Sequence, residues 1–165
     1  MPAYTTRFGS LENYEKGSIE IIADDARHYA FSNIFEVATK SAPYEKVVVA
    51  KNLENVIEVL RAEGGSPWYT CAHDEFALLM DGDIEIHFYR AEDDERADEA
   101  SEGTRIVNGP PRGVKMGWVR LKRGHQAILP KGSVYQYRAR GVGVIMQQTI
   151  SGPLSVEKWA QICYR

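Results

Sequence analysis

A carboxylate and an imidazole two residues apart are the first candidates for chemistry in this chain. Glu75 and His73 supply two of the three ligands that a mononuclear oxygenase iron typically takes, which are two histidines and one carboxylate. The other histidines, His28, His87 and His125, have no spacing that directs them to the same point. The residue types therefore leave a weak metal site open without predicting a complete one.

Two other pairings near Glu75 are also open. His73 and Tyr135 resemble a base and an acid for proton transfer, which needs suitable pKa values within hydrogen-bond reach. A sugar-nucleotide substrate would also require arginines and lysines for its phosphates, but the basic segment 112–123 alternates with apolar residues like a half-solvated strand. Cys71 near His73 also suggests a thiolate paired with an imidazole, although proximity in sequence is weak support for such a pair.

Two glycine-containing patterns surround these residues. Residues 124–135 read GHQAILPKGSVY, and Glu75 is followed by six residues and then Gly82. The patterns resemble the two motifs of cupin barrels, except that Tyr135 stands where the second motif normally carries a metal-binding histidine. The positions at which the first motif could carry its two histidines hold Trp68, Tyr69, Thr70 and Cys71 instead. The resemblance implies an all-β cupin-type double-stranded β-helix, a jelly-roll barrel that keeps the carboxylate of the first motif, Glu75, and has lost the metal-binding histidines.

Strand alternation predicts which side chains point into such a barrel. Successive side chains of a strand face opposite ways, which groups four residues on one face: Tyr69, Cys71, His73 and Glu75. Tyr135 and Tyr137 share a face in the same way, and Trp68 is expected at the mouth of the barrel. Because an unpaired buried carboxylate is costly, we expect Tyr135, Tyr137 or Arg138 to donate a hydrogen bond to Glu75.

Composition and turn residues predict a chain built mostly of short strands. Asp81-Gly82 between the apolar runs 76–80 and 84–88 predicts a type I′ β-hairpin. Many short strands separated by turns favour a barrel or jelly roll over an open sheet. The other predicted strands cover residues 18–25, 29–38, 118–121, 126–129, 135–138 and 142–150.

Helices and one long loop complete the prediction. Asn52 as N-cap and Gly64 as stop predict a helix over residues 52–64, with an apolar stripe formed by Leu53, Val56, Ile57 and Leu60. A short helix is also expected over residues 155–163, with Ser155 as N-cap. Residues 91–113 are acidic and then rich in Gly and Pro, which is typical of a mobile surface loop; a functional lid is the alternative.

The composition is that of an ordinary globular domain. The 165 residues are 44% hydrophobic and 26% charged, and a net charge of -3 gives no general attraction to nucleic acid or anionic membranes. No run approaches the roughly 20 apolar residues of a membrane span. The N-terminus does not read as a secretory signal, so we expect a cytoplasmic protein in which Cys71 and Cys163 are free thiols.

One domain is expected, made of two parts. Residues 46–165 form the barrel with its C-terminal helix, and residues 1–45 form an extension that packs on the barrel or on a partner. The extension is rich in aromatic residues, which mildly favours a partner: Tyr4, Phe8, Tyr14, Tyr29, Phe31 and Phe35.

Five longer segments resemble the small (alpha) subunit of two-component hydroquinone 1,2-dioxygenases, which act in bacterial degradation of 4-nitrophenol and related phenols. The resemblance runs nearly end to end, through residues 4–17, 50–58, 66–76, 123–132 and 154–160. It implies a heteromer, α2β2 in arrangement, with a large cupin-type subunit that binds Fe(II) through two histidines and a carboxylate. The complex uses dioxygen to cleave hydroquinone to 4-hydroxymuconic semialdehyde.

The resemblance also implies the role of this chain. A subunit without the histidines carries no metal and no catalytic residue, so it supports the large subunit and contributes to its substrate pocket. Trp68 leads the pocket candidates, because an indole offers a flat face to a phenolic ring and one N–H donor. The weaker candidates are Tyr69, His73, Glu75 and Tyr135. The alternative is a stand-alone, metal-free cupin that binds a small ligand or acts as a scaffold.

Overall fold

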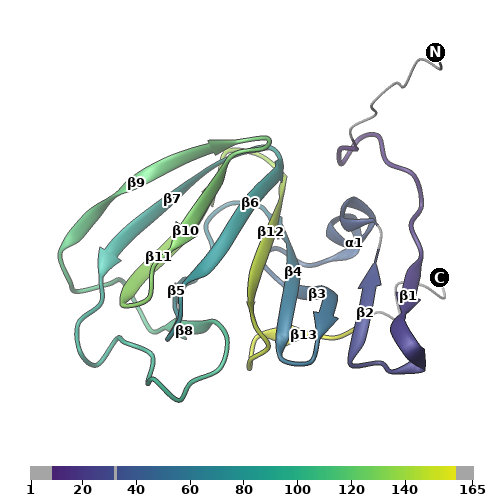
Figure 1. The fold of residues 1–165 in the computed structure, drawn as a ribbon. Helices are drawn as coiled ribbons and strands as arrows, with labels where there is room; N and C mark the ends of the chain where they lie inside the picture. The colour runs from purple at the N-terminus through teal and green to yellow at the C-terminus, as the bar shows by residue number, and fades with distance from the viewer. Residues whose placement is uncertain (1–8, 32, 159–165) are drawn as a thin grey trace, which may run out of the picture.

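The computed structural model describes residues 9–31 and 33–158 as two β-sheets that face each other (Figure 1). The larger sheet has this order: β1 (Ile19–Ile21), β2 (His28–Phe31), β3 (Lys46–Asn52), β4 (Asn55–Ala62), β12 (Gly143–Ile150), β6 (Glu75–Asp81) and β10 (Gln126–Leu129). A short parallel strand, β13 (Ser155–Val156), pairs with β3. The smaller sheet has the order β8 (Arg105–Val107), β5 (Trp68–Thr70), β11 (Ser133–Ala139), β7 (Asp83–Arg90) and β9 (Lys115–Lys122).

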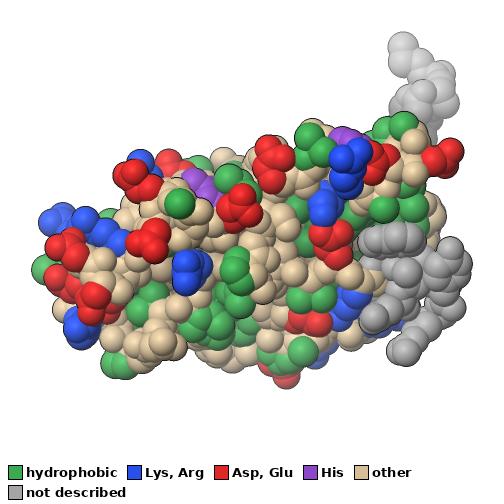
Figure 2. Space-filling view, turned by 90° about the horizontal axis from the view of Figure 1, so that it is seen from below, with side chains coloured by type: hydrophobic (Ala, Val, Ile, Leu, Met, Phe, Trp, Pro, Cys, Tyr) green, Lys and Arg blue, Asp and Glu red, His purple; other side chains and the backbone are tan. Residues whose placement is uncertain are grey.

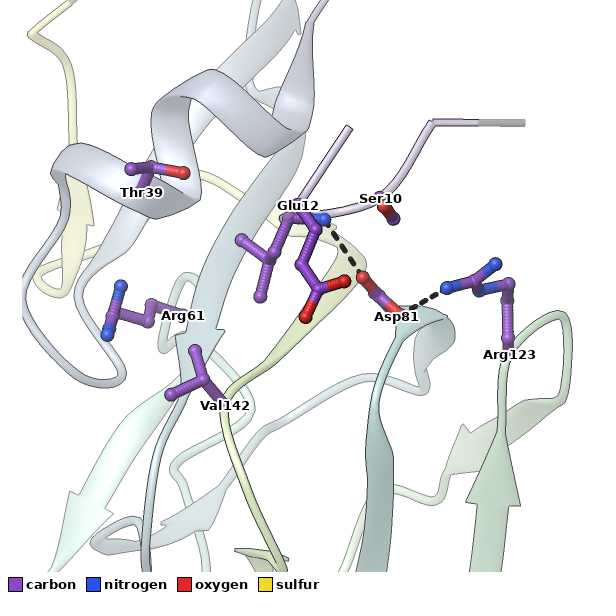
Figure 3. A pocket seen from close by; sticks show the side chains of 8 residues that line it. Ser10, Glu12, Thr39, Arg61, Asp81, Arg123 and Val142 are labelled. Atoms are coloured by element: carbon purple, nitrogen blue, oxygen red, sulfur yellow. Dashed lines mark hydrogen bonds and ion pairs between the residues drawn. The ribbon is translucent and has the colours of Figure 1, made fainter. Parts of the chain in front are cut away.

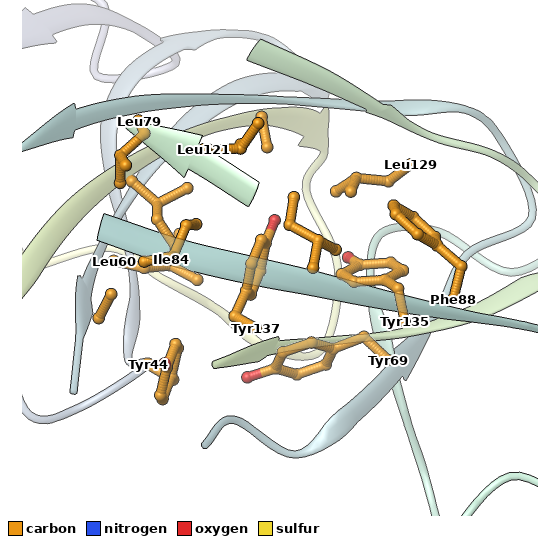
Figure 4. Packing of buried hydrophobic residues seen from close by; sticks show 14 residues of the cluster. Tyr44, Leu60, Tyr69, Leu79, Ile84, Phe88, Leu121, Leu129, Tyr135 and Tyr137 are labelled. Atoms are coloured by element: carbon orange, nitrogen blue, oxygen red, sulfur yellow. The ribbon is translucent and has the colours of Figure 1, made fainter. Parts of the chain in front are cut away.

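The main hydrophobic core lies between the two sheets (Figure 4). Leu60, Leu79 and Ile145 come from the larger sheet, and Ile84 and Tyr137 come from the smaller one. A second cluster covers the other face of the larger sheet, where α1 (Ile34–Lys40) packs against β4 and β12. The larger sheet is therefore buried on both faces at its centre. The strand-rich fold confirms the predicted all-β, cupin-type class.

The predicted helix over residues 52–64 is wrong, because this segment is a central strand. Asn52 ends β3 and pairs with Asn55 across a tight turn at Leu53, whose φ is +57°. Strand β4 then pairs with β3 on one side and β12 on the other. Since α1 covers one face of β4 and the core covers the other, the strand reads as a nearly continuous apolar run, which periodicity does not separate from a buried helix.

The turn at Asp81-Gly82 is present, but the prediction of a β-hairpin there is wrong. Gly82 has a φ of +95°, and a Cβ there would lie 2.8 Å from the Cα of Gly143. The strands on either side belong to different sheets: β6 pairs with β10 and β12, and β7 pairs with β9 and β11. Turn chemistry specifies where the chain reverses, whereas the partners of each strand are set by contacts distant in sequence.

The prediction of a strand over residues 29–38 is correct only for residues 29–31, which belong to β2. Asn33 instead caps α1, because its side chain accepts hydrogen bonds from the N–H groups of Phe35 and Glu36. The strand predicted over residues 18–25 is limited to β1, which is followed by the 3-10 turn η1 (Ile22–Asp24).

Two further predictions need correction. Residues 91–113 are not a plain loop, since β8 pairs with β5 and Thr104 is buried. Ser155 is in β13 and does not begin a helix there, because its hydroxyl donates to buried Glu58. The remainder of the predicted C-terminal helix, with Cys163, lies largely outside the described residues. The strands predicted between residues 118 and 150 are confirmed as β9 to β12.

The surface carries charges of both signs. Acidic and basic side chains are interspersed on the face seen in Figure 2, with hydrophobic side chains between them. In the part of the chain that the structure describes, no helix has the length and apolar character needed to cross a membrane.

Candidate functional site

Glu75 lies at the start of β6 and points between the two sheets, as alternation predicts. The residue is 1% exposed. Its Oε1 accepts hydrogen bonds from the hydroxyls of Thr104 (2.6 Å) and Thr149 (2.7 Å), and its Oε2 accepts one from Tyr135 (2.5 Å). Three hydroxyls therefore compensate the buried carboxylate. Of the alternatives that the sequence predicts, which are Tyr135, Tyr137 and Arg138, Tyr135 donates to Glu75.

Behind these hydroxyls, a chain of hydrogen bonds leads to a buried cation. Gln147 donates through Nε2 to the oxygens of Tyr135 (3.1 Å) and Thr104 (3.3 Å). Its Oε1 accepts from Tyr137 (2.9 Å) and from the ammonium of Lys46 (3.0 Å). Each bond from Lys46 to Glu75 is donated in the same direction. Such an aligned chain in a low-dielectric interior stabilises the carboxylate with charge from the ammonium.

Lys46 also faces a second buried carboxylate, Glu58 on β4. The ammonium lies 3.4 Å from Glu58 Oε2 and 5.0 Å from the centre of the Tyr69 ring. Ser155 donates to the other oxygen, Oε1 (2.6 Å). Among the described residues, Glu58 Oε2 is the buried side-chain oxygen without a hydrogen-bond donor. Burial raises the pKa of Glu58, although nearby Lys46 acts to lower it.

Cys71 and His73 lie beside Glu75, as their spacing predicts. Cys71 Sγ is 3.2 Å from His73 Nδ1, and His73 Nε2 is 3.1 Å from Thr149 Oγ1. Burial, followed by the nearby Glu75 charge, raises the pKa of the Cys71 thiol to about 12. The thiol is therefore protonated at neutral pH, which argues against a reactive thiolate pair.

This group does not fit an iron ion. Possible ligand atoms of Cys71, His73 and Glu75 lie within 4.8 Å of one another. The set contains one imidazole where two are needed, and both oxygens of Glu75 are engaged by hydroxyl donors. Binding a metal here would break those hydrogen bonds and remove the thiol proton.

The buried tyrosines pack against one another at tilted and edge-on angles and do not form a proton-transfer site. Tyr69, Tyr135 and Tyr137 have ring centres 5.6–6.4 Å apart. Burial raises the pKa of all three phenols above the ordinary value, and for Tyr135 the Glu75 charge adds to this effect. The Tyr135 hydroxyl donates to Glu75, so the predicted pairing with His73 is not what the structure displays.

Trp68 does not join this interior. It precedes inward-facing Tyr69 on β5, so its side chain stands on the outer face of the smaller sheet. There its indole makes an edge contact with Tyr89, with ring centres 5.4 Å apart and planes at 89°, and the Arg138 guanidinium lies 6.0 Å from the ring centre. The structure thus separates the lead candidate, Trp68, from the other candidates.

Sequence reasoning missed five polar residues of the interior. Thr104 lies in a segment predicted to be a surface loop, and Glu58 lies in a strand predicted to be a helix. A polar residue inside an otherwise apolar strand is the one signal that marks Glu58 and Gln147 in the sequence. The five residues come from four separate segments: Lys46, Glu58, Thr104, Gln147 and Thr149.

Two surface clefts lie outside this buried group. One, of about 550 Å³, lies beneath the N-terminal segment, where Asp81 accepts hydrogen bonds from the Leu11 N–H and from Arg123 (Figure 3). The other, of about 700 Å³, is lined by charged residues of the 93–98 segment and by Thr70 and Val107. Val107 pairs with Trp68 across β8 and β5, so the second cleft lies next to the backbone of β5.

Two facing sheets, with Glu75 and Tyr135 meeting between them, define a cupin that retains the motif carboxylate and lacks the metal-binding histidines at the motif positions. A cupin-2 domain protein from Shewanella frigidimarina has the same fold, with a TM-score of 0.51 and 17% identity over 73% of this chain and 94% of that chain. No family model and no curated protein matches the chain.

Two solved structures are much more similar. A chain of hydroquinone 1,2-dioxygenase PnpCD, in complex with Cd2+ and 4-hydroxybenzonitrile, is 57% identical over 99% of this chain and 98% of that chain, with a TM-score of 0.85. A chain of hydroquinone 1,2-dioxygenase from Sphingomonas sp. TTNP3, with 4-hydroxybenzoate bound, is 49% identical over 98% of both chains, with a TM-score of 0.86. The chain therefore belongs to the hydroquinone 1,2-dioxygenase family, which comprises ring-cleaving oxidoreductases.

A larger chain of PnpCD, in complex with Fe3+, shares the fold. It is 12% identical, with a TM-score of 0.59, and the match covers 88% of this chain but 41% of the larger one. The family thus contains two kinds of chain with a common cupin fold, and the present chain corresponds to the smaller kind.

Proposed function

We propose that this chain is the iron-free small subunit of a two-subunit, Fe(II)-dependent hydroquinone 1,2-dioxygenase. The complex cleaves hydroquinone with dioxygen to 4-hydroxymuconic semialdehyde. The observation that carries the proposal is the 57% identity over 99% of the chain to a chain of PnpCD. A cytoplasmic α2β2 assembly, predicted from the sequence, is part of the proposal.

The iron belongs to the large subunit in this proposal. That ion supplies dioxygen activation, which the described residues of the present chain do not provide. Support comes from Glu75, whose oxygens are both engaged by hydroxyls, and from the single imidazole, His73, beside it. The interior of the small subunit then acts as a rigid scaffold rather than as a reaction centre.

Substrate contact is assigned to Trp68. Tyr69, Glu75 and Tyr135 are at most 2% exposed and pack against one another, and the partly exposed His73 contacts Cys71 and Thr149. The Trp68 indole is partly exposed on the outer face. An indole at a subunit boundary offers a flat surface to a phenolic ring and an N–H donor to its hydroxyl. Trp68→Ala is expected to raise the KM of the assembled enzyme for hydroquinone about two- to tenfold.

Metal analysis of the separate and assembled subunits tests the proposal. The chain purified alone is expected to contain no stoichiometric iron and to leave hydroquinone unchanged. Co-expression with the larger subunit is expected to give an iron-containing complex that consumes dioxygen and hydroquinone together. Iron bound to the lone chain, or ring cleavage by it, would contradict the proposal; a stable lone chain that never binds a larger subunit would support the stand-alone cupin instead.

A further inference from the structure

The outer face of the smaller sheet carries two tryptophans in contrasting surroundings. Trp68 is partly exposed and is contacted by Tyr89 and Arg138. Trp118, on edge strand β9, is 53% exposed and stacks on His87 with ring centres 6.2 Å apart. Both indoles stand on the same face, but they differ in how firmly they are held.

The surroundings of Trp68 limit its movement on two sides. Tyr89 meets it at 89°, which is the edge-to-face arrangement that aromatic pairs favour. Arg138 adds a cation within about 6 Å of the ring centre, a contact typical of arginine and tryptophan. The indole is therefore restrained by two neighbours from strands β7 and β11.

The exposed side chain of Arg138 is oriented by a hydrogen bond. Its Nε donates to Gln136 Oε1 (2.8 Å), and Gln136 Nε2 donates to the carbonyl of Ser66 (2.8 Å). Ser66 is buried two residues before Trp68, and its N–H donates to the carbonyl of Tyr137 (2.9 Å). The same hydrogen-bonded unit thus holds both the backbone leading to Trp68 and the guanidinium beside its ring.

The indole N–H is still available for recognition. Among the described residues, no acceptor is hydrogen-bonded to the Trp68 Nε1–H, whereas the backbone around it is well bonded. An indole that is fixed in orientation and retains a free donor loses little conformational freedom when it binds a phenol.

We infer that Tyr89 and Arg138 are positioning residues, which hold the Trp68 indole in the orientation that contacts the phenolic substrate at the boundary with the large subunit. This inference rests on the proposed function of Trp68. Neither residue touches the substrate in this account. They act by keeping the indole in one rotamer, so their loss weakens substrate binding more than the chemical step.

A double-mutant cycle on the assembled complex tests the inference. Tyr89→Ala is expected to raise KM for hydroquinone about two- to tenfold with kcat changed by less than about twofold. In a Trp68→Ala background, the same Tyr89→Ala substitution is expected to change KM no further, because the group that it positions is gone. Tyr89→Phe retains the ring and is expected to keep the wild-type KM.

Arg138 is tested in parallel, with a control pair on the same face. Arg138→Lys retains the charge but loses the planar guanidinium, so KM is expected to rise by less than in Arg138→Ala. His87→Ala and Trp118→Ala remove the other stacked pair and are expected to leave KM unchanged. Thermal unfolding of each complex confirms that the variants are folded.

The outcomes separate the inference from the proposed function. If Trp68→Ala raises KM but Tyr89→Ala does not, or if the two effects add, the positioning role is wrong and the contact by Trp68 stands. If Trp68→Ala leaves KM unchanged, the positioning role and the substrate contact by Trp68 are both wrong. The proposal that this chain is the iron-free subunit is then still decided by the iron analysis. An equal rise in His87→Ala would also overturn the inference, because the effect would then be general to the face.

Discussion

Removal of one hydroxyl, in Tyr135→Phe, tests whether the hydrogen bonds of the interior take the place of metal ligation. The Tyr135 hydroxyl is the donor to Glu75 Oε2 at 2.5 Å, and both residues are 1% exposed. A hydrogen bond to a charged group contributes about 1.5–3 kcal/mol, and a buried oxygen left without its donor adds to the loss. We expect the free energy of unfolding to fall by about 3 kcal/mol.

The assay is urea unfolding of the full chain followed by circular dichroism. With a slope of about 2 kcal/mol per molar urea, a loss of this size moves the midpoint by about 1.5 M. The slope itself should not change, because the same surface is exposed on unfolding. Tyr44→Phe is the matched control, since its hydroxyl donates to the neutral carbonyl of Gly64 at 2.6 Å. That substitution is expected to cost about 1 kcal/mol.

The comparison between the two variants decides the question. A loss in Tyr135→Phe no larger than the loss in Tyr44→Phe would mean that Glu75 is not held as a charged acceptor, and the reasoning would be refuted. Added Fe(II) or Zn(II) should not restore stability to Tyr135→Phe, because one imidazole and one carboxylate are too few ligands.

Three further outcomes are expected from unfolding measurements on the same chain. Lys46→Met alone should cost about 3–5 kcal/mol by leaving Glu58 uncompensated, whereas Lys46→Met with Glu58→Leu should recover most of the loss; equal losses in the single and double variants would argue against the pair. Gly82→Ala should cost at least about 2 kcal/mol, because φ is +95° and the new Cβ would meet backbone, whereas Gly141→Ala has open space and should be nearly neutral. Partial burial acts to raise the pKa of Asp81, but Arg123 and two backbone N–H groups donate hydrogen bonds to its carboxylate, and the pKa is lowered as a result. The stability that Asp81 contributes is therefore present above its ordinary pKa and is lost as pH falls through the lowered pKa. Asp81→Asn should weaken the pH dependence of the free energy of unfolding below about pH 4, and an unchanged dependence would argue against this role of Asp81.

Predictions from short-range patterns succeeded where one segment decides the outcome. The Gly-Pro-Gly spacing before Tyr135 and the Glu75 to Gly82 spacing predict strands and turns, and both residues point inward as alternation requires. The predicted helix over residues 52–64 failed because burial on both faces of β4 depends on α1 and on the smaller sheet. No window of sequence contains those contacts.

The sequence by itself determined the cupin class, the loss of the motif histidines and the inward direction of Glu75 and Tyr135 through the resemblance of two short motifs to those of cupins, since each motif lies within one strand and turn. Only the tertiary structure decided that Lys46 compensates the interior carboxylates and that Trp68 stands on the outer face beside Arg138. Lys46 and Gln147 are 101 residues apart in the chain. Such pairs form because buried charges require partners, and which partner is within reach depends on how the sheets pack.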